Sequence, residues 1–508
     1  MKGQRKMVCG ATQTLGLLAF IYLLYTQSFA FDNAVNPFKY CFGNQKTSKW
    51  NATFQKVDFL GHKIHPALKS LMGRLTLFIL IFKCSSVTDY TIDTAKTKAD
   101  GDDGAQRLET RGFTCESAFN CTLCVASNPI KIDTKTMQIY LHSQFNLNNH
   151  TGLLDNEEEK VVQIRPYAWK QLDFLNVTTL KFVHESSSQN SRKDCDYNHE
   201  VPAILFSTGG FIMTGNIFHE FNDIIIPLFI TSFLFKSQVQ FVLVDYNPSF
   251  VKKFSNVFSS LSHYKLLDLM ANTSVHCFPS VVVGLKFHKH LSINSSEVPK
   301  GNSMIDFKKF LGKIYGLKIM IDDLGMYRNK EPLLLLISRR KTRSFLNEDE
   351  IVDMMEELGF DVVVVRSNKK MSNLDKFSKL VSSCSVLVAA HGAGLTNQLF
   401  MSNGSVLVQV VPLGLEWAST VYYGEPAVDL GLYYLEYKIR LNESSLSDLY
   451  GPNDPVILDP GSIFAKGYFV AKEMYLDKQN IRVDVNRFKA TLMEARRIIG
   501  HTTPLNTR

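Results

Sequence analysis

A histidine and an aspartate lie four residues apart in the segment 215–223, which reads Gly-Asn-Ile-Phe-His-Glu-Phe-Asn-Asp. On a helix this spacing places His219 and Asp223 on one face, where the imidazole and the carboxylate can hydrogen bond. Such a pair can serve as a general base, because one member orients and tunes the group that takes the proton. Asn216, in front of the pair, has a side chain that caps helix N-termini. The alternative is a capped helix whose His219 and Asp223 are merely solvated.

Four cations stand within five positions, directly after the apolar run 333–337: Arg339, Arg340, Lys341 and Arg343. Charges at the end of a buried strand are costly unless they face solvent or an anion. Guanidinium forks match the oxygens of a phosphate, so the cluster predicts a binding site for a diphosphate. A solvated basic loop is the alternative.

A third cluster, His-Gly-Ala-Gly-Leu-Thr-Asn at 391–397, follows the apolar run 386–390. A strand, a turn of small residues and a helix start together predict an anion site, because the backbone N–H groups and the helix dipole point at the ligand. The segment lacks the Gly-Lys-Ser/Thr ending of a Walker loop and the six-residue dinucleotide fingerprint. His391 at the strand tip fits either a ligand role or a buried core histidine.

The elements that must position these clusters alternate between strand and helix. Apolar runs that are continuous, as in parallel strands covered on both faces, occur at 202–206, 239–244, 281–285, 333–337, 362–365, 386–390 and 406–411. Helix-length segments occur at 217–235, 304–317, 347–358, 374–382 and 488–499, the third of them with Asn347 as its expected cap and Glu350 three residues later. The pattern predicts α/β layers in two Rossmann-like domains, 113–321 and 322–508, that face one another across a cleft.

The N-terminus predicts a membrane anchor. Three cations, Lys2, Arg5 and Lys6, precede the uncharged segment 7–31, which is long enough to span a bilayer with the rest of the chain in the lumen. A signal peptide cleaved after Ala30 is the alternative. Residues 32–112 are expected to form a stem, and its apolar run 75–82 is too short to span.

Sequons and cysteines agree with a lumenal body. Eight Asn-x-Ser/Thr triplets predict glycosylation at Asn51, Asn120, Asn149, Asn176, Asn272, Asn294, Asn403 and Asn442. The chain has nine cysteines, and the close group Cys115, Cys121 and Cys124 predicts disulfides rather than zinc, because no second ligand pair follows at metal spacing.

Composition narrows the classes of partner. The 508 residues are 45% hydrophobic and 20% charged, which excludes a mostly disordered or collagen-like chain. A net charge of +8 over this length is too mild to predict nucleic-acid binding. The Asp-x-Asp pattern of Asp194 and Asp196 does not follow a strand, so cations and helix N-termini are expected to balance the diphosphate without a metal.

Together the clusters resemble glycosyltransferase family 61, in particular its plant branch of xylan-decorating enzymes, over roughly residues 113 to 500. The most specific matches are 215–223, Ser-Arg-Arg at 338–340, 391–397, and Glu-Trp-Ala-Ser at 416–419 with Tyr423, Gly424 and Pro426. The resemblance implies a GT-B-like fold and a Golgi type II membrane protein anchored by one N-terminal helix, and it leaves open membership of a Golgi enzyme complex. It also implies inverting transfer from a nucleotide sugar, without a cofactor or an essential metal.

The resemblance assigns roles residue by residue. Asp223 is expected to be the general base, with His219 as its orienter or as the substitute base. The donor is expected to bind Arg339, Arg340, Arg343, His391, Gly392, Ala393, Gly394, Asn397 and Glu416. Gly215, Asn216 and Glu220 are expected on the acceptor side.

The implied reaction is transfer of arabinofuranose or xylose from a UDP-sugar to xylan in cell-wall synthesis. The alternatives are an N-glycan core β-1,2-xylosyltransferase, a protein O-linked N-acetylglucosaminyltransferase, and an inactive carbohydrate-binding scaffold subunit.

Overall fold

The computed structural model describes residues 106–110, 113–118, 121–141, 162–168, 177–184, 194–210, 214–298, 301–317, 331–366 and 368–502. All of them belong to the second of two compact units, Met1–Asp100 and Gly101–Arg508. Several expected features lie outside the described residues: the anchor, the apolar run 75–82, the boundary between 321 and 322, and the sequons at Asn51, Asn120, Asn149 and Asn176.

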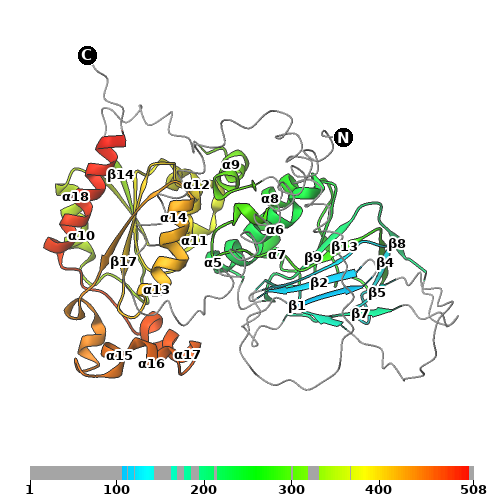
Figure 1. Ribbon diagram of the computed structural model, residues 1–508. Coiled ribbons are helices and arrows are strands. Elements are labelled where there is room, and N and C mark those ends of the chain that lie inside the picture. Colours follow the sequence, from blue (N-terminus) through cyan, green and yellow to red (C-terminus); the bar gives the residue numbers. More distant parts are fainter. Residues whose placement is uncertain are drawn as a thin grey trace, which may run out of the picture. The chain divides into compact units, whose positions relative to one another are not determined.

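The C-terminal sheet is parallel throughout. Its strands lie in the order β15 (Asp361–Val365), β14 (Leu333–Ile337), β16 (Val386–Ala390), β17 (Val406–Val411) and β18 (Tyr433–Lys438). In Figure 1, α10 (Glu348–Glu357) and α18 (Val485–Thr502) cover one face, and α12 (Leu374–Ser383) and α14 (Glu425–Asp429) cover the other. Burial on both faces explains the continuous apolar runs, so the predicted parallel, helix-covered sheet is confirmed here.

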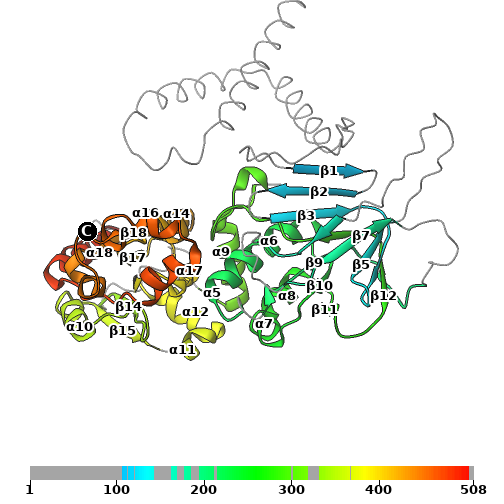
Figure 2. The same cartoon turned by 90° about the horizontal axis from the view of Figure 1, so that it is seen from below.

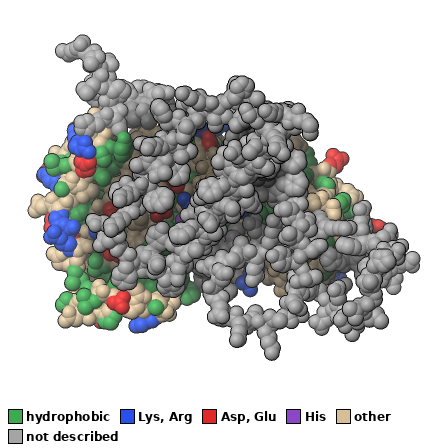
Figure 3. Space-filling model, viewed as in Figure 1, with side chains coloured by type: hydrophobic (Ala, Val, Ile, Leu, Met, Phe, Trp, Pro, Cys, Tyr) green, Lys and Arg blue, Asp and Glu red, His purple; other side chains and the backbone are tan. Residues whose placement is uncertain are grey.

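The outer surface of α10 and α18 is a solvated face. Lys and Arg side chains project from it among apolar ones (Figure 3). Lys489 pairs with Glu357 at 3.5 Å, and Arg497 pairs with Glu494 at 2.6 Å. These charges are matched locally, on the face of the sheet opposite α12 and α14.

The N-terminal half contains two sheets rather than one. The larger has the order β1 (Gln106–Thr110), β2 (Phe113–Ala118), β3 (Cys121–Ala126), β13 (Val281–Val283), β9 (Ala203–Phe206), β10 (Gln240–Leu243) and β11 (Leu267–Asp268). The smaller has the order β6 (Val162–Ile164), β7 (Leu180–His184), β5 (Gln138–Leu141), β4 (Ile130–Asp133), β12 (Val275–Phe278) and β8 (Tyr197–Asn198). β13, β9 and β10 coincide with predicted apolar runs and pair in parallel, and β11, which no run predicted, extends this parallel layer.

An antiparallel extension completes the larger sheet. β1, β2 and β3 lie side by side at its edge (Figure 2), and β3 pairs antiparallel with β13. β1 lies within the range 32–112 that was assigned to the stem. Local composition did not reveal this strand, because an edge strand is held by hydrogen bonds to a neighbouring strand. A disulfide joins Cys115 to Cys124, which face each other in the β2–β3 register, and a second joins Cys195 to Cys277.

A long buried helix follows β9. It runs from α5 (Ile217–His219) through the π-helical turn η3 (Glu220–Ile225) to α6 (Ile226–Ser232) and the 3₁₀ turn η4 (Phe233–Phe235). Among the described residues this stretch is long and apolar enough to cross a membrane, but 72% of its most apolar window is buried inside the protein, as in a core helix. The π turn inserts one extra residue, a feature common at functional sites.

The remaining helices connect and cover the sheets. They are α7 (Pro248–Lys253), α8 (Ser255–Leu261), η5 (Ser295–Glu297), α9 (Met304–Tyr315), α11 (Asn368–Ser372), η8 (Ala393–Phe400), α13 (Glu416–Ser419), η9 (Thr420–Gly424), η10 (Leu441–Glu443), η11 (Ser445–Asp448), α15 (Pro455–Leu458), α16 (Pro460–Phe464), α17 (Tyr468–Ala471) and η12 (Lys472–Asp477).

The predicted cap at Asn347 is wrong in its chemistry. The side chain makes no capping bond to α10; its Nδ2 donates to the Val483 carbonyl at 2.9 Å and its Oδ1 accepts from the Val483 N–H at 3.0 Å. Only the contact from Nδ2 to Glu350, at 3.0 Å, follows the expected spacing. The Asn347 amide bonds the backbone of Val483 rather than the helix end, because an unpaired buried peptide group is costly.

Candidate active site

The His219–Asp223 pair forms as predicted. His219 Nδ1 lies 2.9 Å from Asp223 Oδ2, and Asn216 Oδ1 caps the helix by accepting from the Phe218 N–H at 3.1 Å. The pair straddles the start of the π turn, so Asp223 points into the protein with a side chain that is 1% exposed, whereas that of His219 is 13% exposed. The imidazole is therefore the more accessible member of the pair.

Two further donors enclose the Asp223 carboxylate. The Tyr167 hydroxyl donates to Oδ2 at 2.7 Å, and Asn222 Nδ2 donates to Oδ1 at 2.6 Å. Burial, then the negative charge of Asp223, raises the pKa of Tyr167 well above its ordinary value, so the phenol stays a donor. Gly209, at φ +80°, makes room for this ring, because a Cβ there would lie 2.7 Å from it. Tyr167 lies 56 residues before Asp223, and no local pattern could have identified it.

Glu220, expected on the acceptor side, is turned toward its own chain. It is 2% exposed, accepts from the Gly215 N–H at 3.0 Å and forms an ion pair with Lys253. Gly215 adopts φ +95°, a left-handed conformation that glycine tolerates and that the Glu220 contact holds. Glu220 thereby holds the turn before the helix and positions the side chain of Lys253.

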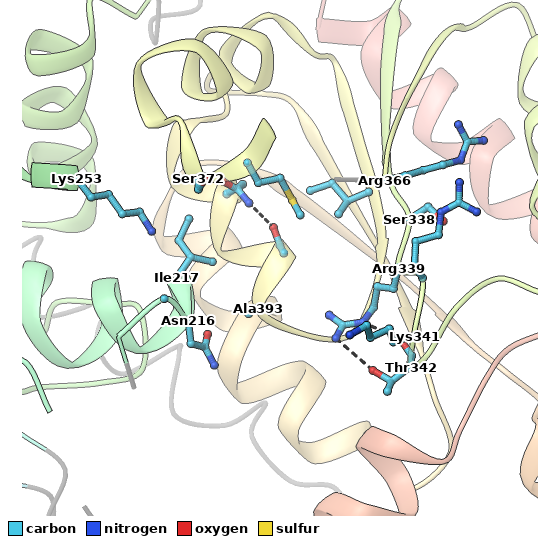
Figure 4. Close-up of a pocket in the computed structure, with 16 residues that line it drawn as sticks. Asn216, Ile217, Lys253, Ser338, Arg339, Lys341, Thr342, Arg366, Ser372 and Ala393 are labelled. Atoms are coloured by element: carbon cyan, nitrogen blue, oxygen red, sulfur yellow. Dashed lines mark hydrogen bonds between the residues drawn. The ribbon is translucent and has the colours of Figure 1, made fainter. Parts of the chain in front are cut away.

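A cavity of about 920 Å³ collects much of the predicted donor site. Its wall is lined by Gly215, Asn216, Ile217, Lys253, Ile337, Ser338, Arg339, Arg340, Lys341, Thr342, Arg366, Met371, Ser372, Ala393, Gly394 and Asn397. Figure 4 shows Asn216, Ile217 and Lys253 on one side, facing Arg339 and Lys341 on the other. Five of the lining side chains are cations, which suits a polyanionic ligand.

Sequence reasoning missed two of those cations. Lys253 ends α7, and Arg366 follows β15, where it pairs with Glu348. Neither belongs to a cluster in the sequence. The position of Arg366 directly after a predicted strand was the available signal, since ligands gather at the carboxyl ends of parallel strands.

Arg339 is a half-buried cation in this wall, and Arg343 is a buried cation behind it. Arg339 Nε donates to the Thr342 carbonyl at 2.8 Å, which folds the side chain against its own loop. Burial lowers the pKa of Arg339, and burial together with the charge of Arg339 lowers that of Arg343 to about 10. Within the described part of the chain neither guanidinium has a carboxylate within ion-pair distance, and the buried Arg343 Nε has no hydrogen-bond partner.

Arg343 also holds a strained backbone. Its φ of +52° lies in the left-handed region that residues with a Cβ seldom adopt. Strain of this kind is kept where the surrounding structure demands it, commonly at ligand sites. The half-buried guanidinium of Arg339 and the buried one of Arg343, neither with a counter-ion among the described residues, form a site with unbalanced positive charge, which suits a phosphate group.

The turn at 391–394 brings its backbone against these arginines. Gly392 adopts φ +144°, and a Cβ there would lie 2.8 Å from Arg339 Nη1, so only glycine lets the guanidinium approach the strand tip. Gly394 packs against Ile337, where a Cβ would lie 3.1 Å from the side chain. The helix that follows is the 3₁₀ helix η8, tighter than the α-helix that the pattern predicted.

His391 is a buried, neutral member of the cluster. Its Nδ1 accepts from Gln409 Nε2 at 3.0 Å and lies 3.0 Å from Ser419 Oγ, which leaves the proton of the neutral ring on Nε2. Burial, then the charges of Arg343 and Arg339, lowers the pKa of His391 to about 3. The ring is 5.3 Å from that of Tyr423, edge to face. His391 thus braces the turn without adding charge.

Other predicted residues lie apart from the large cavity. His219, Asp223, Arg343, His391 and Gly392 stand beside or behind its wall rather than in it. Glu416 is exposed at the start of α13 and is also absent from the wall.

The Asp-x-Asp pattern of Asp194 and Asp196, which was not expected to bind a metal, contributes to the fold through Asp196. Asp196 Oδ2 accepts from the Val275 N–H at 2.7 Å, next to the pairing of β8 with β12. Among the residues that the structure describes, no group of three or more His, Cys, Asp or Glu side chains is arranged to hold a metal ion.

Four sequons can be placed. Asn272 and Asn442 are exposed, and the Asn294 Oδ1 accepts from the Ser296 hydroxyl at 2.8 Å. Asn403 Oδ1 accepts from Lys308 Nζ at 2.7 Å, and that lysine is fully buried, with its pKa lowered to about 7 by burial. Asn403 is therefore the sequon most engaged in packing, and glycosylation of all four stays a prediction.

Comparison with known proteins extends the picture. The sequence model of the family Glycosyltransferase 61 matches residues 217–408. Xylan glycosyltransferase MUCI21 of Arabidopsis thaliana is 36% identical over 425 residues, which cover 80% of this chain and 82% of that protein. Alpha-1,3-arabinosyltransferase XAT3 of Oryza sativa subsp. japonica is 34% identical over 420 residues, 81% of this chain and 70% of that protein. Beta-1,2-xylosyltransferase XYXT1 of the same rice is 39% identical over 306 residues, 59% of this chain and 64% of that protein.

Proposed function

Because this chain belongs to the glycosyltransferase 61 family, we propose that it transfers a pentose, arabinofuranose or xylose, from a UDP-sugar to xylan. Of the similar plant proteins named above, one is called a xylan glycosyltransferase, one an arabinosyltransferase and one a xylosyltransferase. The observation that carries the proposal is the pair Arg339 and Arg343, one half-buried and one buried, which has no counter-ion among the described residues and lies at a cationic cavity near the His219–Asp223 pair. An anionic donor and an acceptor hydroxyl are the two substrates that such a site suits.

The donor's diphosphate binds at the arginine cluster. Arg339 and Arg343 supply charge, and the Gly392 turn supplies close backbone approach. Lys253 and Arg366 add cations across the cavity. These cationic and backbone N–H groups are held in place before the reaction. They stabilise the charge that develops on the departing UDP, which lowers the barrier to its release.

Acceptor activation falls to the His219–Asp223 pair. Asp223 is enclosed by three hydrogen bonds, so we assign the proton to His219 Nε2, the ring nitrogen opposite the one that Asp223 holds. Asp223 then stabilises the imidazolium. These roles exchange the order expected from the sequence, in which Asp223 was the base and His219 its orienter or substitute.

The reaction is a single inverting displacement. The acceptor oxygen forms a bond to the anomeric carbon as the bond from that carbon to the phosphate oxygen breaks. The acceptor proton goes to His219, and the bonding electrons leave with UDP. The chemistry asked of the protein is proton transfer, positioning and charge stabilisation, so the proposal includes no metal ion.

The proposal extends to architecture and location. We place the enzyme in the Golgi as a single-pass type II protein, within a GT-B-like arrangement of its two halves. The uncharged segment 7–31 and the two disulfides support a lumenal body, because disulfides persist in oxidising compartments.

The test is donor-dependent transfer. The glycosylated protein is incubated with xylan oligosaccharides and, in turn, with UDP-xylose, UDP-arabinofuranose and UDP-N-acetylglucosamine, and the products are read by mass. Addition of one pentose is expected, and it should disappear in a His219→Ala variant that still binds UDP. Transfer only to an N-glycan or a glycopeptide would overturn the acceptor, and donor binding without transfer to any acceptor would favour a scaffold subunit.

A further inference from the structure

A second, smaller cavity lies next to the catalytic pair. Its volume is about 230 Å³, and its wall is lined by Phe287, His288, Lys289, His290, Ser292, Val421, Glu425, Pro426 and Asp429. The loop 287–292 forms one side, and η9 with α14 forms the other. None of these residues lines the large cationic cavity.

The loop is tied to the catalytic helix. Asn222 donates to Asp223 through Nδ2 and accepts from the Leu291 N–H through Oδ1, at 2.8 Å. His290 lies close enough for the charges of Asp223 and His219 to influence its pKa, although burial is the larger effect and lowers it. Through His290, the small cavity therefore borders the pair to which we assign acceptor activation.

A row of rings leads from this point to the surface. His290 lies 4.6 Å from the Tyr422 ring, and Tyr422 lies 5.7 Å from Trp417. Phe218, next to His219, lies 5.3 Å from Tyr422. Trp417 at the outer end is 68% exposed, an unusual state for so large an apolar side chain.

The chemistry of the small cavity differs from that of the large one. Glu425 and Asp429 place two carboxylates in its wall, and Lys289 is also among the lining residues. The Glu425 carboxylate has no hydrogen-bond or ion-pair partner among the described residues, while Asp429 accepts from the Ser292 hydroxyl. Carboxylates repel a diphosphate but accept hydrogen bonds from sugar hydroxyls. The large cavity therefore suits an anionic ligand, and the small cavity suits a neutral carbohydrate.

We propose that this cavity and the ring row Trp417–Tyr422–His290 form the track that binds the xylan acceptor chain. The apolar C–H face of a pyranose packs on an aromatic ring, and its hydroxyls reach the carboxylates and imidazoles beside it. The inference rests on the proposed function for the identity of the sugar. It goes beyond that function by assigning Trp417 and Glu425 as acceptor-binding residues.

The track makes a prediction about acceptor length. Trp417 stands two ring contacts away from Phe218, the neighbour of the catalytic histidine. A short acceptor seated at His219 does not reach the indole, whereas a long one does. Trp417→Ala should therefore weaken the binding of xylohexaose much more than the binding of xylobiose. A merely structural role of Trp417 would not produce this difference.

The experiment measures binding and transfer on the full chain. Xylohexaose, xylobiose and UDP are titrated by calorimetry into the parent, Trp417→Ala, Trp417→Phe and Glu425→Gln. Tyr433→Ala is the matched control, because Tyr433 is 46% exposed and pairs with Val406 at the opposite end of the parallel sheet. Trp417→Ala should raise the Kd and the KM for xylohexaose by about tenfold or more. The UDP affinity and the kcat of Trp417→Ala should not change. Trp417→Phe should retain most of the affinity for xylohexaose. Glu425→Gln should weaken the binding of xylohexaose by a smaller factor than Trp417→Ala.

Each outcome decides the proposal. Xylohexaose binding that neither Trp417→Ala nor Glu425→Gln weakens overturns the track and leaves the proposed function in place. A parent chain that binds UDP but not xylohexaose overturns the track together with xylan as the acceptor. Length-dependent binding without transfer supports the track and counts against catalysis.

Discussion

The carboxylate of Asp223 and the guanidinium of Arg343 are both buried, yet their charges are compensated to very different degrees. Asp223 receives hydrogen bonds from Tyr167, His219 and Asn222. Arg343 has a buried Nε without a partner, a like charge nearby in Arg339, and a lowered pKa. The charge of Asp223 is balanced within the protein, whereas that of Arg343 is not balanced among the described residues.

The difference fits the two substrates of the proposed reaction. An acceptor hydroxyl is neutral, so the groups that receive it are best preorganised around a balanced charge. A diphosphate is anionic, so the pocket that receives it must hold spare positive charge, at a cost in stability while it is empty. Variants in the two regions should therefore change stability in opposite directions.

The largest effect is expected at the balanced region. Asp223→Asn removes the charge that stabilises the His219 imidazolium, and its amide nitrogen cannot accept the bonds that a carboxylate oxygen accepts. We expect kcat to fall about 10²–10⁴-fold, with UDP affinity unchanged and the folded state less stable. Steady-state kinetics and UDP calorimetry on the same preparation measure both.

Tyr167→Phe is the matched control for that variant, because it keeps the carboxylate and removes one donor. It should lose about tenfold in kcat. Transfer by Asp223→Asn at the parent rate would remove the pair from the mechanism.

A two-sided effect is expected at the unbalanced region. Arg343→Met replaces a buried cation that lacks a counter-ion by an apolar side chain of similar length. The free energy of unfolding of the empty protein should rise by about 1–3 kcal/mol, while UDP affinity falls about 10–100-fold. Urea unfolding and calorimetry provide the two measurements.

Arg340→Met serves as the control in the same loop, because Arg340 is exposed. It should leave stability nearly unchanged. A loss of stability in Arg343→Met together with unchanged UDP affinity would mean that the guanidinium is structural, and the contrast between the two regions would fail.

A smaller effect concerns pH. Burial, Arg343 and Arg339 lower the pKa of His391 from 6.5 to about 3, so below pH 6.5 the unfolded chain binds a proton that the folded chain does not. The stability contributed by the neutral ring is complete above pH 6.5 and declines as the pH falls toward 3. His391→Gln should reduce the pH dependence of unfolding by up to about 1.4 kcal/mol per pH unit in this range.

Urea unfolding at several pH values between 4 and 7.5 tests this expectation, with the parent chain as reference. Arg343→Met offers an internal check, because removing its charge should raise the pKa of His391 and flatten the same slope in part. Parallel pH curves for the parent and His391→Gln would show that the ring is not held neutral by its surroundings.

Local pattern was sufficient for several parts of this protein. The i, i+4 spacing of His219 and Asp223 predicts their contact, because helix geometry fixes which side chains share a face. The bounds of β14, β16 and β17 match continuous apolar runs, because strands buried on both faces need apolar residues at every position. Gly392 and Gly394 belong to the predicted turn of small residues, and the structure shows that a Cβ at either position would crowd a neighbouring side chain.

Only the tertiary structure decided which remote segments complete the site. Tyr167 reaches Asp223 across 56 positions, Lys253 and Arg366 face the arginine loop, and Val483 takes the amide of Asn347 from the helix it was expected to cap. The antiparallel strands β1 to β3 and the ring row at Trp417 also depend on neighbours far away in the chain. Spacing along a helix or strand is set by local backbone geometry, whereas contacts between segments are set by sheet order and by packing summed over the whole fold, which no short window of sequence contains.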